Sequence, residues 1–288
     1  MQGAVECGAC TALLLTRTLA HRTSADGWRP HFGPVMAEAA GMMAGAPHPG
    51  VALERMYQVL EDRLQDEDPY AAVKDEANAR MEAWWAEAAR GPKPDLAQLL
   101  AWAVAGNSID AGVDTRVDPT WEQFTAAAAE PLSRDDRAVA AAWVAQHPGA
   151  RVLYLLDNAG EAVLDRECMR ALAARGLAVT AVVKGGPIIN DVTRREADRL
   201  GLASVATVWD TGAARYGTMR GRVPDAVWAE WEAADLVVAK GLAHLETLSH
   251  EPRRGPVLFL YRAKCPPSAR LLGVPPESSV AWWRAPAP

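Results

Sequence analysis

The 288-residue sequence has no apolar run near the ~20 residues that a membrane-spanning helix requires. It contains only four cysteines, too few for a disulfide scaffold in a chain of this length. It also has no excess of basic residues, since 30 Lys and Arg stand against 36 Asp and Glu, a net charge of -6. We therefore expect no membrane partner and no nucleic-acid partner.

The N-terminal segment, MQGAVECGACTALLLTR, has no basic leader ahead of its apolar run, and its cleavage-site features are poor. We interpret it as mature sequence rather than a signal peptide. Half of the residues are hydrophobic, which is enough for a substantial core. A reduced, cytoplasmic protein fits this composition best, and the composition leaves the oligomeric state open.

The hydrophobic periodicity of the chain changes near residue 150. Residues 1–148 are predicted to be helical throughout, because their apolar residues keep helical spacing between stops that contain Gly or Pro. Strand-like runs then follow at 152–156, 179–183, 204–209, 236–239 and 257–261. They alternate with predicted helices at 162–175, 194–200, 225–234 and 244–249.

Alternation of strands and helices indicates βαβ units and a parallel sheet. The predicted fold class is therefore α/β, with an all-helical N-terminal domain packed on a Rossmann-like, doubly wound α/β/α domain. We expect the helical domain to cover residues 1–148 and the α/β domain, which carries the metal and the catalysis, to cover residues 149–288.

The first strand ends in two adjacent oxygen donors. The apolar run 152–156 is typical of a strand buried on both faces, and it stops at Asp157-Asn158. A helical stripe follows, so these two residues lie at the carboxyl end of a strand, where open α/β sheets bind ligands. Such donors, with no thiol or imidazole beside them, suit a hard cation. The alternative is an ordinary Asx turn that caps the next helix.

Other predicted strand ends also carry polar or glycine residues. With those of the first strand, the full set is Asp157, Asn158, Glu161, Lys184, Gly185, Gly186, Asn190, Asp191, Asp210, Thr211, Gly212, Lys240, Gly241, His244, Glu246, Lys264 and Cys265. Because the carboxyl ends of parallel strands meet at one edge of a sheet, these residues can form one site. We interpret Lys184 and Asp210 as surface residues. Glu246 has the alternative role of stabilising a helix start.

The residue types suggest a division of labour within this site. Asp157, Asn158 and Asp191 offer oxygens to one divalent ion, which leaves places for water and a substrate phosphate. Lys240 and Lys264 offer positive charge to an anionic group, most simply a phosphate. Together they indicate phosphoryl transfer, in which positioning and charge neutralisation supply most of the catalysis.

Six segments, in order along most of the chain, carry a resemblance to a known family. They are Cys7-x-x-Cys10; Asp68-Pro69-Tyr70 with Lys74 and Asn78; Gly106-Asn107-Ser108-Ile109-Asp110; Asp157-Asn158-Ala159-Gly160-Glu161 with Asp165; residues 184–191 (KGGPIIND); and Lys240-Gly241 with Glu246, followed by Ala263-Lys264-Cys265. Together they resemble the DUF89 family, the damage-control or ARMT1-like metal-dependent phosphatases. The match is to its prokaryotic branch, which has an N-terminal cysteine pair.

The resemblance implies hydrolysis of small phosphorylated metabolites, either sugar phosphates or their damaged relatives. It implies a metal on residues matching Asp157, Asn158 and Asp191, with Mg²⁺ or Mn²⁺ expected and Co²⁺ or Ni²⁺ as further candidates. Residues expected in catalysis are Asp157, Glu161, Lys240 and Lys264. Residues expected to bind the substrate are Asn107, Asp110, Asn190, Gly241, His244 and Glu246.

One departure from the family pattern affects substrate choice. Relatives commonly carry Gly-Asn-Phe-Glu after the Lys-Gly pair, whereas this chain has Ala243-His244-Leu245-Glu246. A histidine at this place can change the substrate or add a proton donor.

The expected mechanism is direct hydrolysis. The metal polarises a phosphoryl oxygen, while Lys240 and Lys264 neutralise the remaining charge. Asp157 or Glu161 orients the attacking water, or Asp157 is itself the nucleophile. The residues leave these routes open.

Two other enzyme classes fit the first strand end less well. An aspartyl-phosphate hydrolase of the haloacid-dehalogenase type needs Asp-x-Asp, and Ala159 stands where its second Asp belongs. A nucleotide- or S-adenosylmethionine-dependent enzyme needs a Gly-rich turn, and this segment supplies only Gly160. A narrow-specificity pathway enzyme on the same fold remains an alternative.

The cysteine pair supports a different class, a metal-binding or redox module. Cys7 and Cys10 alone are weak evidence for structural zinc, which takes four ligands. Cys265 or a histidine can complete such a site if the fold brings it near. The other interpretation is a buried structural pair.

Overall fold

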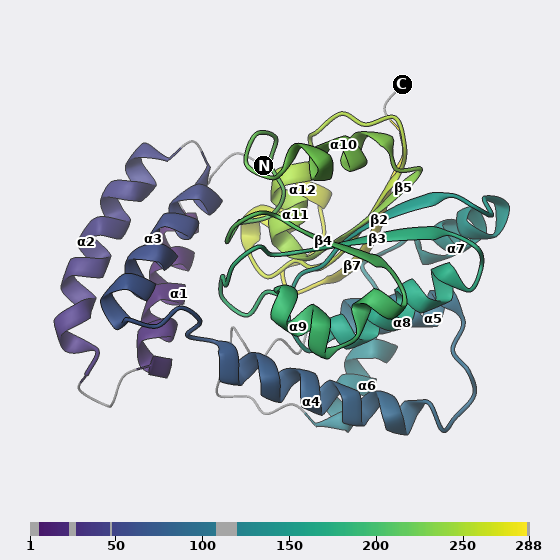
Figure 1. Ribbon diagram of the computed structural model, residues 1–288, viewed down its shortest axis with the longest axis horizontal. Helices are drawn as coiled ribbons and strands as arrows, with labels where there is room; N and C mark the ends of the chain where they lie inside the picture. The colour runs from purple at the N-terminus through teal and green to yellow at the C-terminus, as the bar shows by residue number, and fades with distance from the viewer. Residues whose placement is uncertain (1–5, 23–26, 47, 108–119, 287–288) are drawn as a thin grey trace.

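The computed structural model describes residues 6–22, 27–46, 48–107 and 120–286 (Figure 1). Its centre is a seven-stranded sheet with the strand order β1-β7-β6-β5-β2-β3-β4. The strands are β1 (Arg134–Asp135), β2 (Arg151–Leu155), β3 (Ala178–Val183), β4 (Thr207–Asp210), β5 (Leu236–Lys240), β6 (Val257–Arg262) and β7 (Ser279–Arg284). Strands β2 to β6 are parallel, while β7 runs antiparallel to β6 and parallel to β1.

Strand β2 is central because its side chains are apolar on both faces. Val152 and Tyr154 belong to the core on one face of the sheet, and Leu153 and Leu155 belong to the core on the other. Both cores are covered by helices, so the sheet is doubly wound and the predicted α/β class is confirmed.

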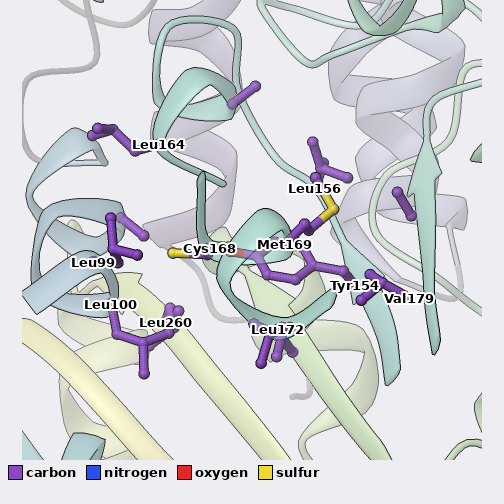
Figure 2. Packing of buried hydrophobic residues seen from close by; sticks show 14 of the residues in the cluster. Leu99, Leu100, Tyr154, Leu156, Leu164, Cys168, Met169, Leu172, Val179 and Leu260 are labelled. Carbon is purple, nitrogen blue, oxygen red and sulfur yellow. The ribbon is translucent and has the colours of Figure 1, made fainter. Parts of the chain in front are cut away.

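One face of the sheet is covered by a large set of helices, which share one hydrophobic core with it. These are α4 (Ala71–Ala88), α5 (Leu96–Gly106), α6 (Trp121–Ala129), α7 (Arg137–Gln146), α8 (Glu161–Ala173) and α9 (Arg194–Arg199). Figure 2 shows Leu99 and Leu100 of α5 in the same core as Tyr154 of β2 and Cys168 of α8.

The opposite face is covered by α10 (Asp225–Ala233), α11 (Gly241–Leu248) and α12 (Pro266–Leu272). A separate bundle of α1 (Glu6–Arg22), α2 (Arg29–Gly45) and α3 (Pro49–Leu64) stands beside the sheet, on the left in Figure 1. It has its own core, which includes Ile188 from the loop after β3. The domain boundary at residues 148 and 149 stays a prediction.

The structure differs from the expected elements in two strands and one strand start. Strand β1 lies in the half expected to be all-helical, and its two residues are exposed, so only pairing with β7 defines it. The antiparallel β7 was also not expected. The run expected to start at Ser204 begins at Thr207, because Leu202–Ser204 form a 3₁₀ helix. No helix among the described residues is both long and apolar enough to cross a bilayer.

Candidate active site at the carboxyl edge of the sheet

The candidate site lies where the chain changes direction within the sheet. From β2 the strands progress to β3 and β4 on one side, and β5 then pairs with the other side of β2. The crevice beyond β2 and β5 is thus the switch point at which doubly wound sheets bind ligands. Asp157 and Gly241 meet there: a Cβ on Gly241, whose φ is +74°, would lie 1.9 Å from Asp157 Oδ2.

Backbone hydrogen bonds bring the loop after β3 to the same place. The N–H of Val192 donates to the Asp157 carbonyl at 2.9 Å, and the N–H of Ala159 donates to the Asn190 carbonyl at 2.9 Å. They pair Asn158 with Asp191 in an isolated antiparallel bridge. The predicted metal ligands Asp157, Asn158 and Asp191 are thereby brought together, each less than a tenth exposed.

Two of these three ligands are acids that repel each other. Burial raises the pKa of Asp157 well above its ordinary value, the nearby carboxylates Asp191 and Glu161 raise it further, and Lys184 and Lys264 oppose them. Two carboxylates and one amide are hard oxygen donors that face one cavity, and a divalent cation between them would relieve their repulsion. The residues therefore fit the metal that the sequence predicts.

Lys184 is not the surface residue that we expected. Its side chain is 1% exposed, and its Nζ lies 3.3 Å from Asp191 Oδ2. The loop after β3 folds back over the strand end, so Asp191 covers Lys184. Asp210 is half-buried at the surface, where it forms an ion pair with Arg194 at 2.8 Å.

Two amide side chains orient the acids of the site. Asn107 Nδ2 donates to Asp157 Oδ2 at 3.1 Å and to Glu161 Oε1 at 3.0 Å. Asn158 Nδ2 donates to the same two oxygens at 2.8 and 2.9 Å. Gly106 makes this possible, since a Cβ there would lie 2.7 Å from Glu161 Cβ and push α5 away from α8.

Lys240 lies beneath this layer and contacts three acceptors. Its Nζ donates to Glu161 Oε2 at 2.6 Å, to Asp165 Oδ2 at 3.1 Å and to the Ala103 carbonyl at 3.0 Å. Burial by itself lowers the pKa of Lys240, but Asp165 and Glu161 outweigh it and hold the pKa above its ordinary value. Tyr154 completes the cluster by donating to Asp165 at 2.6 Å.

A cavity of about 710 Å³ opens from the sheet edge towards the helical bundle. Its polar lining includes the three metal-ligand candidates together with Asn107, Asn190, Glu246 and Lys264. Among the described residues that line it, neither Glu161 nor Lys240 is found. These two expected catalytic residues therefore contact the site from behind its wall.

The expected substrate-binding residues are divided between several places. Glu246 lines the cavity and accepts a hydrogen bond from the Tyr216 hydroxyl at 2.9 Å. His244 is buried with Nδ1 2.7 Å from the Lys240 carbonyl, and burial lowers its pKa to about 3, so the imidazole is neutral. Gly241 makes room for Asp157. Asp110 lies outside the described residues.

The segment 68–78 has a structural role in this fold. Lys74 is fully buried and pairs with Asp68 at 2.6 Å and Glu196 at 3.3 Å. Asn78 Oδ1 accepts the N–H of Gly160 at 2.7 Å and so holds the turn that precedes α8. The sequence did not predict the roles of Asp165, Tyr154, Tyr216 and Lys184. The one local signal for Asp165 was its partner Tyr154, a residue with a polar hydroxyl inside an otherwise apolar strand.

The cysteine pair is not buried, contrary to one of our two interpretations. Cys7 is half-buried and Cys10 is exposed, because both lie on the face of α1 that borders the cavity, which Cys265 also lines. Among the described residues no three His, Cys, Asp or Glu side chains converge as a metal cluster, and the second metal site stays a prediction. The candidate metal site at Asp157 is not such a cluster, because one of its three donors is an asparagine amide.

A family model described as the damage-control phosphatase ARMT1-like domain matches residues 14–280. The chain belongs to this family. The DUF89 resemblance is therefore confirmed, while the branch assignment from Cys7 and Cys10 stays a prediction, because both precede the matched range.

Two relatives of this ARMT1-like chain are named damage-control phosphatases. The one from Archaeoglobus fulgidus is 34% identical over 230 residues, covering 76% of this chain and 77% of the relative. The one from Pyrococcus horikoshii is 30% identical over 230 residues, covering 79% and 78%. A crystal structure of a DUF89 family protein from Pyrococcus horikoshii superposes with a TM-score of 0.87 at 26% identity, over 98% of both chains.

Proposed function

We propose that the chain is a divalent-metal-dependent phosphatase that hydrolyses small phosphorylated metabolites. Membership of a family whose relatives are named damage-control phosphatases supports the phosphatase activity. The observation that carries the metal dependence is the convergence of Asp157, Asn158 and Asp191 on one cavity, where burial and the neighbouring acids raise the pKa of Asp157.

The three residues would hold the ion, with Mg²⁺ or Mn²⁺ favoured by their oxygen donors. When bound, a divalent ion polarises a phosphoryl oxygen and offsets its charge. Lys264 lines the same cavity and supplies positive charge to the phosphate. Lys184 balances Asp191 from within the protein.

Asp157 is the carboxylate at the reacting centre. It lines the cavity, whereas Glu161 lies behind the wall and is bound to Lys240 and to two amides. Asp157 therefore orients the attacking water or attacks the phosphorus itself, and trapping an acyl phosphate with hydroxylamine separates the two routes. Glu161 and Lys240 are positioning residues that act through Asn158 and Asn107.

The experiment is phosphate release from sugar phosphates, damaged phosphometabolites and p-nitrophenyl phosphate with Mg²⁺, Mn²⁺, Co²⁺, Ni²⁺ or EDTA. We expect release that requires a metal and that EDTA abolishes. The matched variants are Asp157→Ala and Asp210→Ala, two acids near strand ends, of which only Asp157 borders the cavity. Equal release with and without EDTA would contradict the proposal.

A further inference from the structure

The cavity has a second wall that phosphate chemistry does not explain. Helices α1 and α3 and the loop after β3 contribute aliphatic side chains to it, including Leu14, Leu53, Ile188 and Ile189. The ring of Tyr216 adds aromatic surface and packs so closely on α3 that a Cβ on Gly50 would lie 2.0 Å from it. This apolar wall is continuous with the polar edge of the sheet.

Helix α1 turns one face towards the cavity. Its lining residues form two rows with spacings of three or four, as one helical face does, namely Glu6, Cys10, Leu13 and Arg17 beside Cys7, Thr11 and Leu14. The Thr11 hydroxyl donates to the carbonyl of Cys7 at 2.9 Å, so its proton is used within the helix. Between Glu6 and Arg17 at its ends, this face therefore offers mainly two thiols and two aliphatic side chains.

Ile189 has a backbone conformation that is rare for its residue type. Its φ is +48°, in the left-handed region that glycine and asparagine adopt readily and that β-branched residues avoid. The flanking residues hold it there, because Ile188 is buried in the core of the bundle and the Asn190 carbonyl accepts a bond from Ala159. Its side chain packs against the core of the bundle and also lines the cavity, where it offers aliphatic surface to a ligand.

We propose that the substrates are phosphomonoesters whose alcohol part carries an apolar alkyl or aryl group. Ile189 and Leu14 then determine specificity for that group. The inference rests on the proposed function for the phosphate end of the substrate. A cavity of about 710 Å³ lies within the range of roughly 300–1,000 Å³ that encloses drug-sized ligands. A polyol in the same place would lose hydrogen bonds to water against the aliphatic wall.

The test is calorimetric binding of methyl-, propyl- and pentylphosphonate to the full chain in Mn²⁺, because phosphonates are not hydrolysed. We expect the Kd to fall roughly two- to fourfold for each methylene added. We also expect 2-hydroxyethylphosphonate, which matches propylphosphonate in size, to bind at least about threefold more weakly than propylphosphonate. A Kd that does not change with chain length would overturn the inference.

Variants locate the effect on the apolar wall. Ile189→Asn replaces the aliphatic group with a residue that tolerates the left-handed conformation, and Leu14→Gln keeps helix propensity. We expect both variants to reduce the gain in affinity per added methylene to less than about twofold. Leu271→Gln is the control, since Leu271 is 40% exposed on α12 and outside the cavity lining. The gain in affinity per methylene in this variant should equal that of the unchanged chain.

The outcomes separate the two proposals. Hydrolysis of p-nitrophenyl phosphate with a flat phosphonate series would refute the apolar substrate class and leave the phosphatase standing. A graded phosphonate series without hydrolysis of any matching alkyl phosphate would refute the phosphatase and support the apolar site. Failure of every phosphonate to bind at millimolar concentration would refute the substrate class, whatever the hydrolysis assay gives.

Discussion

Two buried polar clusters lie next to each other at the carboxyl edge of the sheet, and they differ in their access to the cavity. Around Lys240, the amine contacts Glu161 and Asp165, and Tyr154 donates to Asp165. Around Asp157, two carboxylates border a cavity. The comparison teaches that the Lys240 cluster, here called matched because both of its acids contact the same lysine away from the cavity, is costly to disrupt. The Asp157 cluster, here called unmatched because its acids border the cavity, is the better candidate for ligand binding.

The largest expected effect is on activity, in the unmatched cluster. Asp157→Ala should lower kcat/KM by a factor of about 10³ or more, because it removes both a metal ligand and the carboxylate at the reacting centre. Its Tm without metal should be equal to or above that of the unchanged chain, since the repulsion with Asp191 is removed. Phosphate release and thermal melts in EDTA test this, and loss of activity together with a large fall in Tm would mean that the variant simply unfolds.

The next effect is on stability, in the matched cluster. Lys240→Met should cost about 3–5 kcal/mol of unfolding free energy, because Glu161 and Asp165 are left buried without a counter-charge. Added Mn²⁺ should restore little of this loss.

Lys184→Met is the corresponding variant in the unmatched cluster, because this lysine is equally buried but faces Asp191. Its loss of stability should be largely reversed by Mn²⁺, since a bound cation supplies the missing positive charge. Urea unfolding of both variants with and without Mn²⁺ gives the comparison. The same Mn²⁺ response in both would remove the distinction between the two clusters.

A smaller effect is expected from one hydroxyl of the matched cluster. Tyr154→Phe removes the bond to Asp165 and should cost about 1 kcal/mol, because that buried oxygen loses one donor but keeps the ammonium of Lys240 at 3.0 Å. We expect kcat to change by less than about threefold, since Tyr154 does not border the cavity. Denaturant melts alongside initial rates check this, and a loss of activity as large as that of Asp157→Ala would place Tyr154 in the reaction.

The smallest effect concerns Glu61 on α3, a partly buried acid that lies away from the site and near other acids. Burial and the neighbouring acids Asp68, Asp62 and Glu67 raise its pKa from 4.5 to about 7. The folded state therefore binds this proton more tightly than the unfolded state, and stability falls as pH rises from about 4.5 to about 7.

Glu61→Gln should raise the Tm by roughly 2–4 °C at pH 8.5, after allowance for its partial exposure. The gain at pH 5.0 should be clearly smaller, because the carboxyl is then mostly protonated in the folded state. The exposed residue Glu76 on the neighbouring helix provides the control variant, Glu76→Gln. Melting curves at the two pH values test this, and a gain independent of pH would contradict the assignment.

Local sequence pattern was enough to predict the strand ends, and with them most of the candidate site. Asp157 and Asn158 follow an apolar run directly, and Asp191 lies in the loop after the next strand, which backbone hydrogen bonds fold back onto Asn158. The direction of a long side chain was not predictable. Lys240 and Lys184 both stand at strand ends, yet their partners depend on whether α8 or the folded-back loop is near. Strand β1 was missed for a related reason, since its pairing partner lies about 145 residues later in the chain.

The central claim is that the unmatched cluster is the metal site, and calorimetric titration with Mn²⁺ tests it most directly. We predict that the unchanged chain and Asp210→Ala each bind one Mn²⁺ per chain, and that Asp157→Ala loses this binding while it remains folded. Binding of Mn²⁺ by Asp157→Ala with unchanged affinity would contradict the account.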